Sequence, residues 1–290
     1  PEGAKDITLQ KTGRGKTVRG EITYSDTPNY LKLTTKNIQA TFNKRGQDVI
    51  NHLIINGRET AVNGKLIALL EKHTGSLYHE VKENIAYISQ VSEVVLEEIG
   101  PLKAVIKVSG FHYNEDLKRN VLPFTLRFTF HYEDVSVGVT HSFIYDGDAD
   151  KDYLKGLGMQ FDCPLEGEVY NRHIKFGGDH GYFSEALQML LSWRPKLRPG
   201  LYEEQMAGQI MHFDKEKEPE VFEAMKKITV WDSYHFVQDH ANNYDIKKRT
   251  AHTSCAYIDC MSGERAKGIA AITGEQGGMA IAMRDFWQRY

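Results

Sequence analysis

Residues 126–131 read LRFTFH, and apolar residues alternate with polar ones through the whole stretch. Because successive side chains of a β-strand point to opposite faces, this pattern predicts a strand with one face buried. Leu31 and Leu33 alternate with polar neighbours in the same way. Dipeptides that suit tight turns recur along the chain, at Asn56-Gly57, Asn63-Gly64, Ser109-Gly110, Asp146-Gly147 and Ser262-Gly263. Many strands with short connections predict an antiparallel sandwich instead of alternating strands and helices.

Two segments depart from the strand pattern. Residues 184–191, SEALQMLL, have helical spacing, and Ser184 can cap a helix at its start. Residues 214–225, DKEKEPEVFEAM, are strongly charged and predict an exposed loop with one helical turn. Neither segment supports a helical domain. We therefore expect an all-β fold, a large antiparallel β-sandwich with one or two short helices.

The domain organisation follows from where the pattern begins. The first 28 residues are polar, with three glycines and a basic run between Lys11 and Arg19. We interpret residues 1–28 as an edge strand and loops that link to a preceding domain. No Pro/Gly/Ser-rich linker divides the remainder, so residues 29–290 are predicted to form one β-sandwich domain.

Composition excludes several classes of protein. The chain has 290 residues, with 36 Lys and Arg against 39 Asp and Glu, and a formal net charge of −3. This balance argues against a nucleic-acid partner bound through bulk charge. No apolar run approaches the roughly 18 residues that span a bilayer, so no membrane partner is expected. The three cysteines exclude a disulfide-rich scaffold, and the spacing of Cys255 and Cys260 does not favour a disulfide.

Four polar residues, Tyr170, Asn171, Arg172 and His173, stand together beside strand-like sequence. Histidine can act as a base near neutral pH, tyrosine can donate a proton, and arginine can bind a carboxylate through two hydrogen bonds. Asn171 could bind a substrate. On an extended segment, however, Tyr170 and Arg172 share one face and the other two share the opposite face. An ordinary polar network at a strand end is the alternative.

The run Asp146–Asp152, DGDADKD, resembles the start of a calcium loop. The match then fails, because Lys151 stands where that loop needs glycine and Leu157 where it needs glutamate. A hairpin turn is the better interpretation, and calcium bound by the Asp oxygens stays an alternative. The histidines lack the spacing of a metal site, so neither a metal nor another cofactor is predicted.

Two further segments could bind sugars. The candidate residues are Lys248, Arg249 and His252 in the first segment and Arg284, Asp285 and Trp287 in the second. The basic strand could bind an acidic sugar, and the indole could stack on a sugar ring while its charged neighbours bind hydroxyl groups. The alternatives are a solvated charged face for the first segment and aromatic core packing for the second.

Several stretches together resemble a known family. They are LPF at 122–124, HSFIYDGDADKDYLKGLGMQF from His141, PLEGEVYNRHIKFGG from Pro164, KRT at 248–250, GERAKGIA from Gly263 and GGMAIAMRDFWQ from Gly277. This set resembles the central β-sandwich of the exo-rhamnogalacturonan lyase-like family, over residues 92–290 and more weakly from Tyr30. The resemblance implies a galactose-mutarotase-like supersandwich between a small β-barrel and an (α/α) toroid. We expect the chain to lack most of the barrel and the toroid.

The resemblance implies β-elimination at a uronic acid, with an oligo- or polysaccharide and flanking domains of a longer protein as partners. Side-chain chemistry suggests His173 as the base, Arg172 as the carboxylate clamp and Tyr170 as the acid. One alternative is a noncatalytic carbohydrate-binding or structural module. Another is an aldose-epimerase-like enzyme that uses His141, His173 and Glu185. Since polysaccharides do not enter cells intact, we expect an extracellular or periplasmic location, with cytoplasmic processing of imported oligosaccharides as the alternative.

Overall fold

A computed structural model describes residues 20–76, 79–191, 197–250 and 255–288. The chain forms two compact units. In the described part of the chain, the first unit comprises residues 20–58 and 63–160, and the second comprises residues 59–62 and 161–288.

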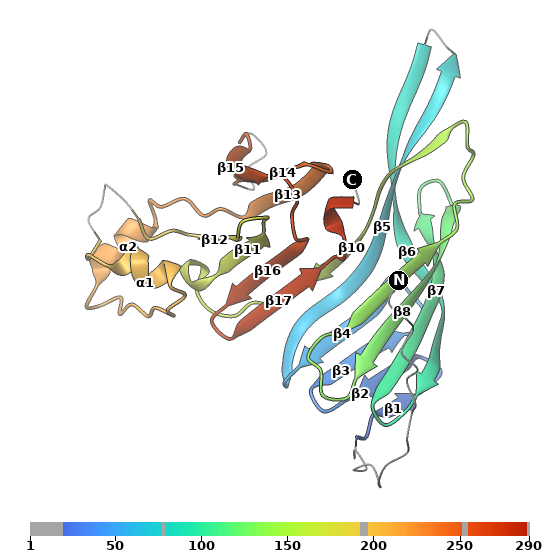
Figure 1. The fold of residues 1–290 in the computed structure, drawn as a ribbon, viewed down its shortest axis with the longest axis horizontal. Coiled ribbons are helices and arrows are strands. Elements are labelled where there is room, and N and C mark those ends of the chain that lie inside the picture. Colours follow the sequence, from blue (N-terminus) through green and yellow to red (C-terminus); the bar gives the residue numbers. More distant parts are fainter. Residues whose placement is uncertain (1–19, 77–78, 192–196, 251–254, 289–290) are drawn as a thin grey trace, which may run out of the picture. The chain divides into compact units, whose positions relative to one another are not determined.

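The first unit is a ten-stranded antiparallel sheet, in which strands β1 to β9 pair in chain order and β10 pairs with β5 (Figure 1). The strands are β1 (Thr23–Asp26), β2 (Tyr30–Thr34), β3 (Ile38–Asn43), β4 (Ile50–Ile55), β5 (Arg58–Ser76), β6 (His79–Ile99), β7 (Lys103–Asn114), β8 (Arg119–His131), β9 (Gly138–Phe143) and β10 (Asp152–Asp162). The antiparallel order explains why short connections suffice between most neighbours.

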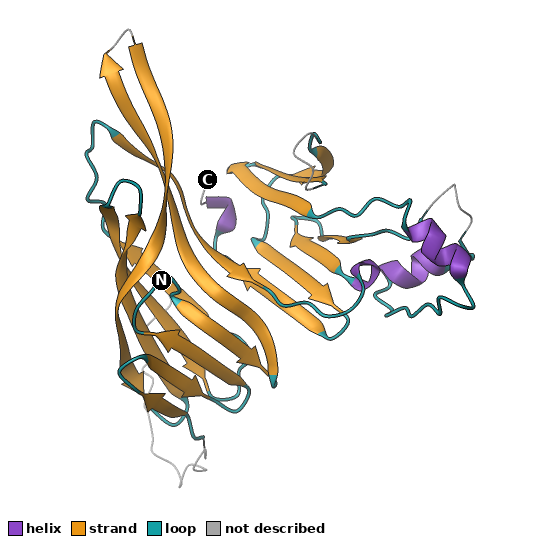
Figure 2. Ribbon diagram, turned by 180° about the vertical axis from the view of Figure 1, so that it is seen from behind, coloured by secondary structure: helices purple, strands orange, loops and turns teal. Residues whose placement is uncertain are grey.

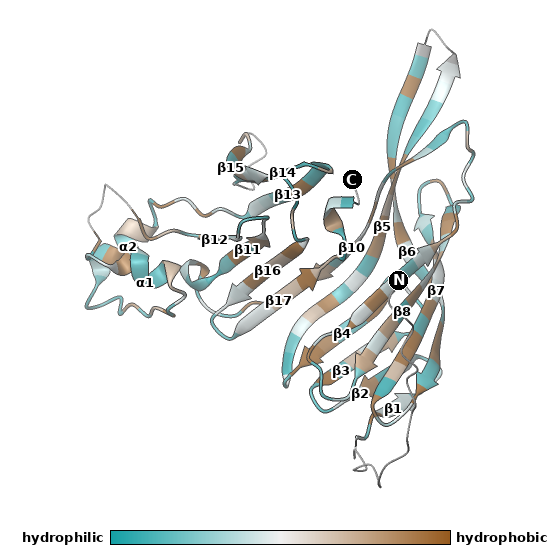
Figure 3. Ribbon diagram, in the orientation of Figure 1, coloured by the Kyte–Doolittle hydropathy of each residue, from teal (hydrophilic) through white to brown (hydrophobic). Residues whose placement is uncertain are grey.

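Alternation along the strands builds the core of this unit. Hydrophobic and hydrophilic residues are mixed along its strands (Figure 3). Leu126, Phe128 and Phe130 of β8 are buried, and Phe128 packs edge-on against Phe42 of β3 with ring centroids 5.1 Å apart. Leu31 and Leu33 of β2 are also fully buried. The strand predictions from both alternating stretches are therefore confirmed.

Only some of the turn dipeptides form turns. Asn56-Gly57 joins β4 to β5 with φ angles of 52° and 77°, the left-handed values that a tight hairpin needs. Asn63-Gly64 and Ser109-Gly110 instead lie inside β5 and β7. The hairpin predicted at Asp146–Asp152 is wrong, because β9 pairs with β8 and the following β10 pairs with β5. This segment therefore connects two strands that are not partners.

The second unit contains two antiparallel sheets (Figure 2). One has the order β12-β11-β16-β17, with β11 at His173–Gly177, β12 at Tyr182–Ala186, β16 at Ile269–Gly274 and β17 at Gly277–Ala282. The other has the order β13-β14-β15, with β13 at Ser233–His240, β14 at Asn243–Arg249 and β15 at Ile258–Gly263. Phe176 of the first sheet shares one buried cluster with Tyr244 and Ile246 of the second.

Within residues 20–76, 79–191, 197–250 and 255–288, helical structure is confined to short elements of the second unit. The α-helices are α1 (Leu201–Met206) and α2 (Pro219–Met225), and the 3-10 helices are η1 (Val169–Asn171) and η2 (Phe286–Gln288). The helix predicted at residues 184–191 is wrong, because Ser184 lies in β12. The all-β prediction with one or two short helices is confirmed. In the described residues, no helix is long and apolar enough to cross a membrane.

Candidate active site

A polar cavity of about 200 Å³ lies on one face of the sheet that contains β11. Strand pairing places Thr273 opposite His173 and Ser184 opposite Lys175. Because paired residues share a face, these four side chains belong together. The cavity is lined by them, by Asn171 and Gly274, and by residues 206–210, which begin at the last residue of α1.

His173 is the group in this cavity with acid–base chemistry. Its side chain is buried, and its Nε2 lies 3.0 Å from the backbone oxygen of Gln205. A carbonyl oxygen can only accept a hydrogen bond, so Nε2 carries a proton and donates. In the neutral ring Nδ1 is then the unprotonated nitrogen, which can accept a proton. Lys175, two residues along the same strand, contributes an exposed cation to the same cavity.

Two buried amides hold the chain that forms the cavity wall. Asn171 donates from Nδ2 to the oxygen of Met211 at 2.9 Å and accepts from the nitrogen of Met211 at 3.0 Å. Gln205 donates from Nε2 to the oxygens of Tyr170 and Gln188, at 2.7 and 2.8 Å. These bonds satisfy polar groups out of water and fix residues 205–211 against the start of β11.

The other two predicted catalytic residues are engaged elsewhere. Tyr170 packs in an apolar cluster with residues such as Leu190, and burial raises its pKa to about 12. Arg172 donates from Nη2 to the backbone oxygens of Leu165 and Gly167, at 3.2 and 2.9 Å. The segment is not extended as the alternation argument assumed, because residues 169–171 form the 3-10 helix η1. Of the three predicted catalytic side chains, His173 lines the cavity.

Lys248 forms a buried ion pair between the two sheets. Its Nζ lies 2.7 and 2.6 Å from the two carboxylate oxygens of Glu185, and the side chains are 10% and 9% exposed. Tyr234 also donates to Glu185 at 2.8 Å, and burial together with this carboxylate raises the pKa of that tyrosine. The Nζ lies 4.5 Å from the centroid of the Trp231 ring. The structure thus places Lys248 within the core of this unit.

The epimerase alternative needs His173 and Glu185 on one surface. Strand pairing sets Ala186 opposite His173, so Glu185 points to the other face of the sheet. The third residue of that hypothesis, His141, lies in β9 of the first unit. The carboxylate of Glu185 and the imidazole of His173 therefore do not converge on one surface.

The remaining sugar-binding candidates occupy separate places. Arg249 lies on the opposite face of β14 from Lys248, with its guanidinium carbon 4.5 Å from the centroid of the Tyr257 ring. His252 lies outside the described residues. Asp285 and Trp287 line a shallow hollow of about 330 Å³, together with residues 265–267 and Phe286. Arg284 is exposed and is not part of that lining.

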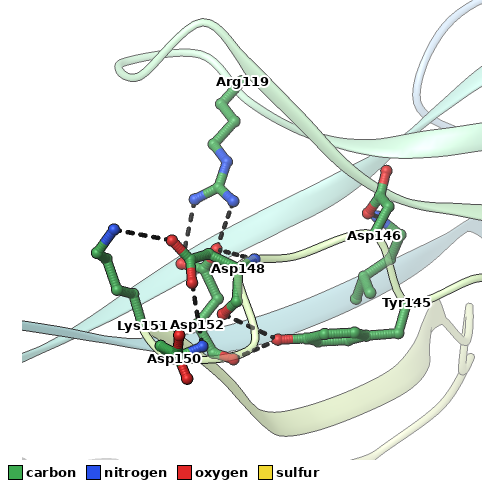
Figure 4. A network of polar contacts seen from close by, with 8 residues as sticks. Arg119, Tyr145, Asp146, Asp148, Asp150, Lys151 and Asp152 are labelled. Carbon is green, nitrogen blue, oxygen red and sulfur yellow. Dashed lines mark hydrogen bonds and ion pairs between the residues drawn. The ribbon is translucent and has the colours of Figure 1, made fainter.

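The acidic run is held by protein partners (Figure 4). Asp152 accepts two bonds from Arg119, at 3.2 and 2.5 Å, and these bonds lower its pKa. Asp148 pairs with Lys151 at 2.9 Å, and Asp146 accepts from the nitrogen of Leu122 at 2.7 Å. Across the described residues, no group of three or more His, Cys, Asp or Glu side chains could hold a metal ion. No disulfide joins Cys255 and Cys260.

Sequence reasoning assigned no role to several residues of these sites, among them Lys175, Gln205, Arg265 and Lys267. Lys175 follows His173 by two positions, and this strand spacing was a signal that could have found it. Gln205, Arg265 and Lys267 gave no such signal, because their partners are distant in sequence or are aromatic rings. Their positions depend on tertiary packing.

The chain thus combines a ten-stranded antiparallel sheet with a unit of two antiparallel sheets, one of which has a polar cavity. A family model described as the PcRGLX-like protein central beta sandwich domain matches residues 22–290, and the chain belongs to this family. The resemblance to the central β-sandwich is therefore confirmed. The chain is also similar to "Uncharacterized protein YetA" of Bacillus subtilis (strain 168), with 34% identity over 265 residues. The match covers 91% of this chain and 31% of that relative, so the chain spans about a third of its length.

Proposed function

We propose that the chain is the β-sandwich part of a polysaccharide lyase that cleaves a uronic-acid-containing glycan by β-elimination. Membership of the PcRGLX-like family supports the carbohydrate class. The observation that carries the proposal is the cavity that combines His173, oriented by the Gln205 carbonyl, with the cation of Lys175. A base next to a cation in a polar cavity is what abstraction of a proton beside a carboxylate requires.

The reaction assigns a role to each of these groups. His173 takes the C5 proton of the uronic acid on Nδ1, and Lys175 balances the negative charge that develops on the adjacent carboxylate. The electron pair forms the C4–C5 double bond while the C4–O4 bond breaks. The imidazolium then returns its proton to the leaving oxygen. Ser184 and Thr273 line the same cavity, and their hydroxyl groups would donate hydrogen bonds to the sugar.

In this proposal Lys175 supplies the cation that the sequence prediction assigned to Arg172. His173 serves as base and then as acid, because Tyr170 is packed among apolar side chains. An extracellular or periplasmic location belongs to the same proposal, since an intact polysaccharide would be met outside the cytoplasm. Flanking domains of a longer protein would complete the cleft.

The test uses the longest form of the protein that contains this chain, with rhamnogalacturonan oligosaccharides as substrate. The readout is the ultraviolet absorbance of the unsaturated uronate product. We expect His173→Gln to lower kcat about 10²- to 10⁴-fold, the usual contribution of a general base. Lys175→Gln should lower kcat about 10-fold or more through the loss of charge stabilisation.

His180→Gln is the matched control, because the His180 side chain is 91% exposed and lies in the same unit. Activity of His173→Gln within twofold of wild type would refute the assigned role. Sugar binding without any unsaturated product would support the noncatalytic module in place of the lyase.

A further inference from the structure

A second site lies at the other end of the β16–β17 hairpin. Thr273 and Gly274, next to the hairpin turn, line the His173 cavity. Arg265 and Lys267 precede β16 and line the hollow with Trp287, which follows β17. At about 3.3 Å per residue, the six positions from Lys267 to Thr273 correspond to about 20 Å along the strand. The hollow and the cavity are therefore separate sites.

The hollow contains two cations that no carboxylate of the described chain neutralises. Arg265 donates from Nε and Nη2 to Oδ1 of Asn242, at 3.2 and 3.1 Å. Within the described ranges its Nη1 has no partner, so two N–H donors stay available. Lys267 contacts the face of the Tyr182 ring, with Nζ 5.7 Å from the ring centroid. Both side chains are exposed at the surface.

Trp287 adds an aromatic surface to these charges. The guanidinium carbon of Arg265 lies 4.6 Å from the centroid of the indole ring. The indole ring and the hydrogen bonds from Arg265 to Asn242 together hold the guanidinium in place. Asp285 completes the hollow with a carboxylate.

We propose that this hollow binds a uronic acid residue of a glycan. Arg265 and Lys267 bind the sugar carboxylate, Trp287 packs against the apolar face of the ring, and Asp285 accepts bonds from hydroxyl groups. Two cations against one carboxylate favour an anionic ligand. Asp285 distinguishes a sugar from a phosphate group, since a carboxylate accepts from hydroxyls and repels a doubly charged anion.

The ligand class rests on the proposed function, but binding does not require turnover at His173. The hollow would hold a distant residue of the same acidic chain, which raises affinity for long glycans by adding a second contact.

The test measures binding of trigalacturonate to the 290-residue chain by isothermal titration calorimetry. Neutral galactotriose and inorganic phosphate are the comparison ligands. We expect trigalacturonate to bind at least about 10-fold more tightly than either, because charge-assisted hydrogen bonds are stronger than neutral ones. Lys267→Gln and Arg265→Gln should each weaken binding about 10-fold, and Trp287→Ala should weaken it by a similar factor.

One variant serves as the control. Lys215→Gln removes an exposed lysine of the same unit outside the hollow, so it should not change the affinity measured at the hollow. Circular dichroism of each variant checks its fold, and Arg265→Lys tests the arginine with its charge retained.

Wild-type affinity in Lys267→Gln and Trp287→Ala would overturn the proposal, as would equal affinity for phosphate and trigalacturonate. The two proposals fail separately. Binding that depends on the hollow, in a protein that forms no unsaturated product, would support this site and refute the lyase. Lyase activity with unchanged binding in the hollow variants would support the lyase and refute this site.

Discussion

Replacing Lys248 by methionine tests the buried ion pair of the second unit. Methionine keeps most of the apolar stem but removes the ammonium that contacts both oxygens of Glu185 at 2.7 and 2.6 Å. The carboxylate would then stay buried with the hydroxyl of Tyr234, 2.8 Å away, as its donor. Breaking a buried pair on one side costs about 3–5 kcal/mol. Because Tyr234 still donates, we expect a loss of about 3 kcal/mol in the free energy of unfolding.

The neighbouring residue provides a matched control. Lys247 lies on the opposite face of β14 and pairs with Asp259 at 3.2 Å, where the side chains are 40% and 83% exposed. Exposed pairs contribute about 1 kcal/mol or less, so Lys247→Met should cost no more than that. The double variant that carries Lys248→Met and Glu185→Met should recover most of the loss, because no unpaired charge is then left in the core.

Urea unfolding followed by tryptophan fluorescence measures these differences. All tryptophans of the sequence lie between residues 161 and 290, so the signal reports on the second unit. The reasoning is refuted if Lys248→Met lies within about 1 kcal/mol of Lys247→Met. It is also refuted if the double variant is no more stable than Lys248→Met alone.

Two other predictions concern the histidines of the first unit and a glycine of the second. Burial lowers the pKa of His112 and His141, so the unfolded chain binds more protons than the folded one below the ordinary histidine pKa of about 6.5. The free energy of unfolding should be constant above that pH and then fall by up to about 1.4 kcal/mol per pH unit for each histidine. Urea unfolding midpoints, followed by circular dichroism from pH 7.5 to 5.0, measure this change. A flat profile would contradict the prediction. Gly278→Ala would bring a Cβ to 1.9 Å from the backbone oxygen of Ile272, whereas a Cβ at Gly158 meets nothing within 4 Å. We expect Gly278→Ala to cost about 2 kcal/mol or more and Gly158→Ala under about 1 kcal/mol in chemical denaturation, and similar costs for the two variants would be the contrary result.

The strands could be predicted because their signal is local. In β2, and in β8 from Leu122 onward, each buried residue is followed by a more exposed one, and burial on one face is the cause of the alternation. The helix predicted at residues 184–191 was wrong because its signal was also only local. Spacing of apolar residues over one short stretch does not show whether a neighbouring strand is present, and here β11 pairs along Tyr182–Ala186. Tertiary pairing outweighed a weak helical preference.

The roles of individual charges were harder to predict. From the sequence, Lys248 was one more member of an exposed basic run. In the structure it faces the core, where it pairs with Glu185. This pairing was not predicted because Glu185 is 63 residues away in sequence. A charge run gives no indication of which member is neutralised by a distant carboxylate. The same holds for Arg265, whose position depends on the indole of Trp287 and on Asn242.

Residues 170–173 form one polar motif in which three residues have structural contacts and the fourth, His173, is proposed to act on the substrate. Most buried polar groups are hydrogen-bonded, and Asn171 donates from Nδ2 to the oxygen of Met211 and to Glu275, while Arg172 donates from Nη2 to the oxygen of Gly167. Tyr170 supplies apolar packing together with a carbonyl that accepts from Gln205. His173 differs because a ring with two nitrogens can bond to the Gln205 backbone through one of them and keep the other for a substrate. The three preceding residues hold the frame that orients this ring, and one side chain of the four is proposed to act on the sugar.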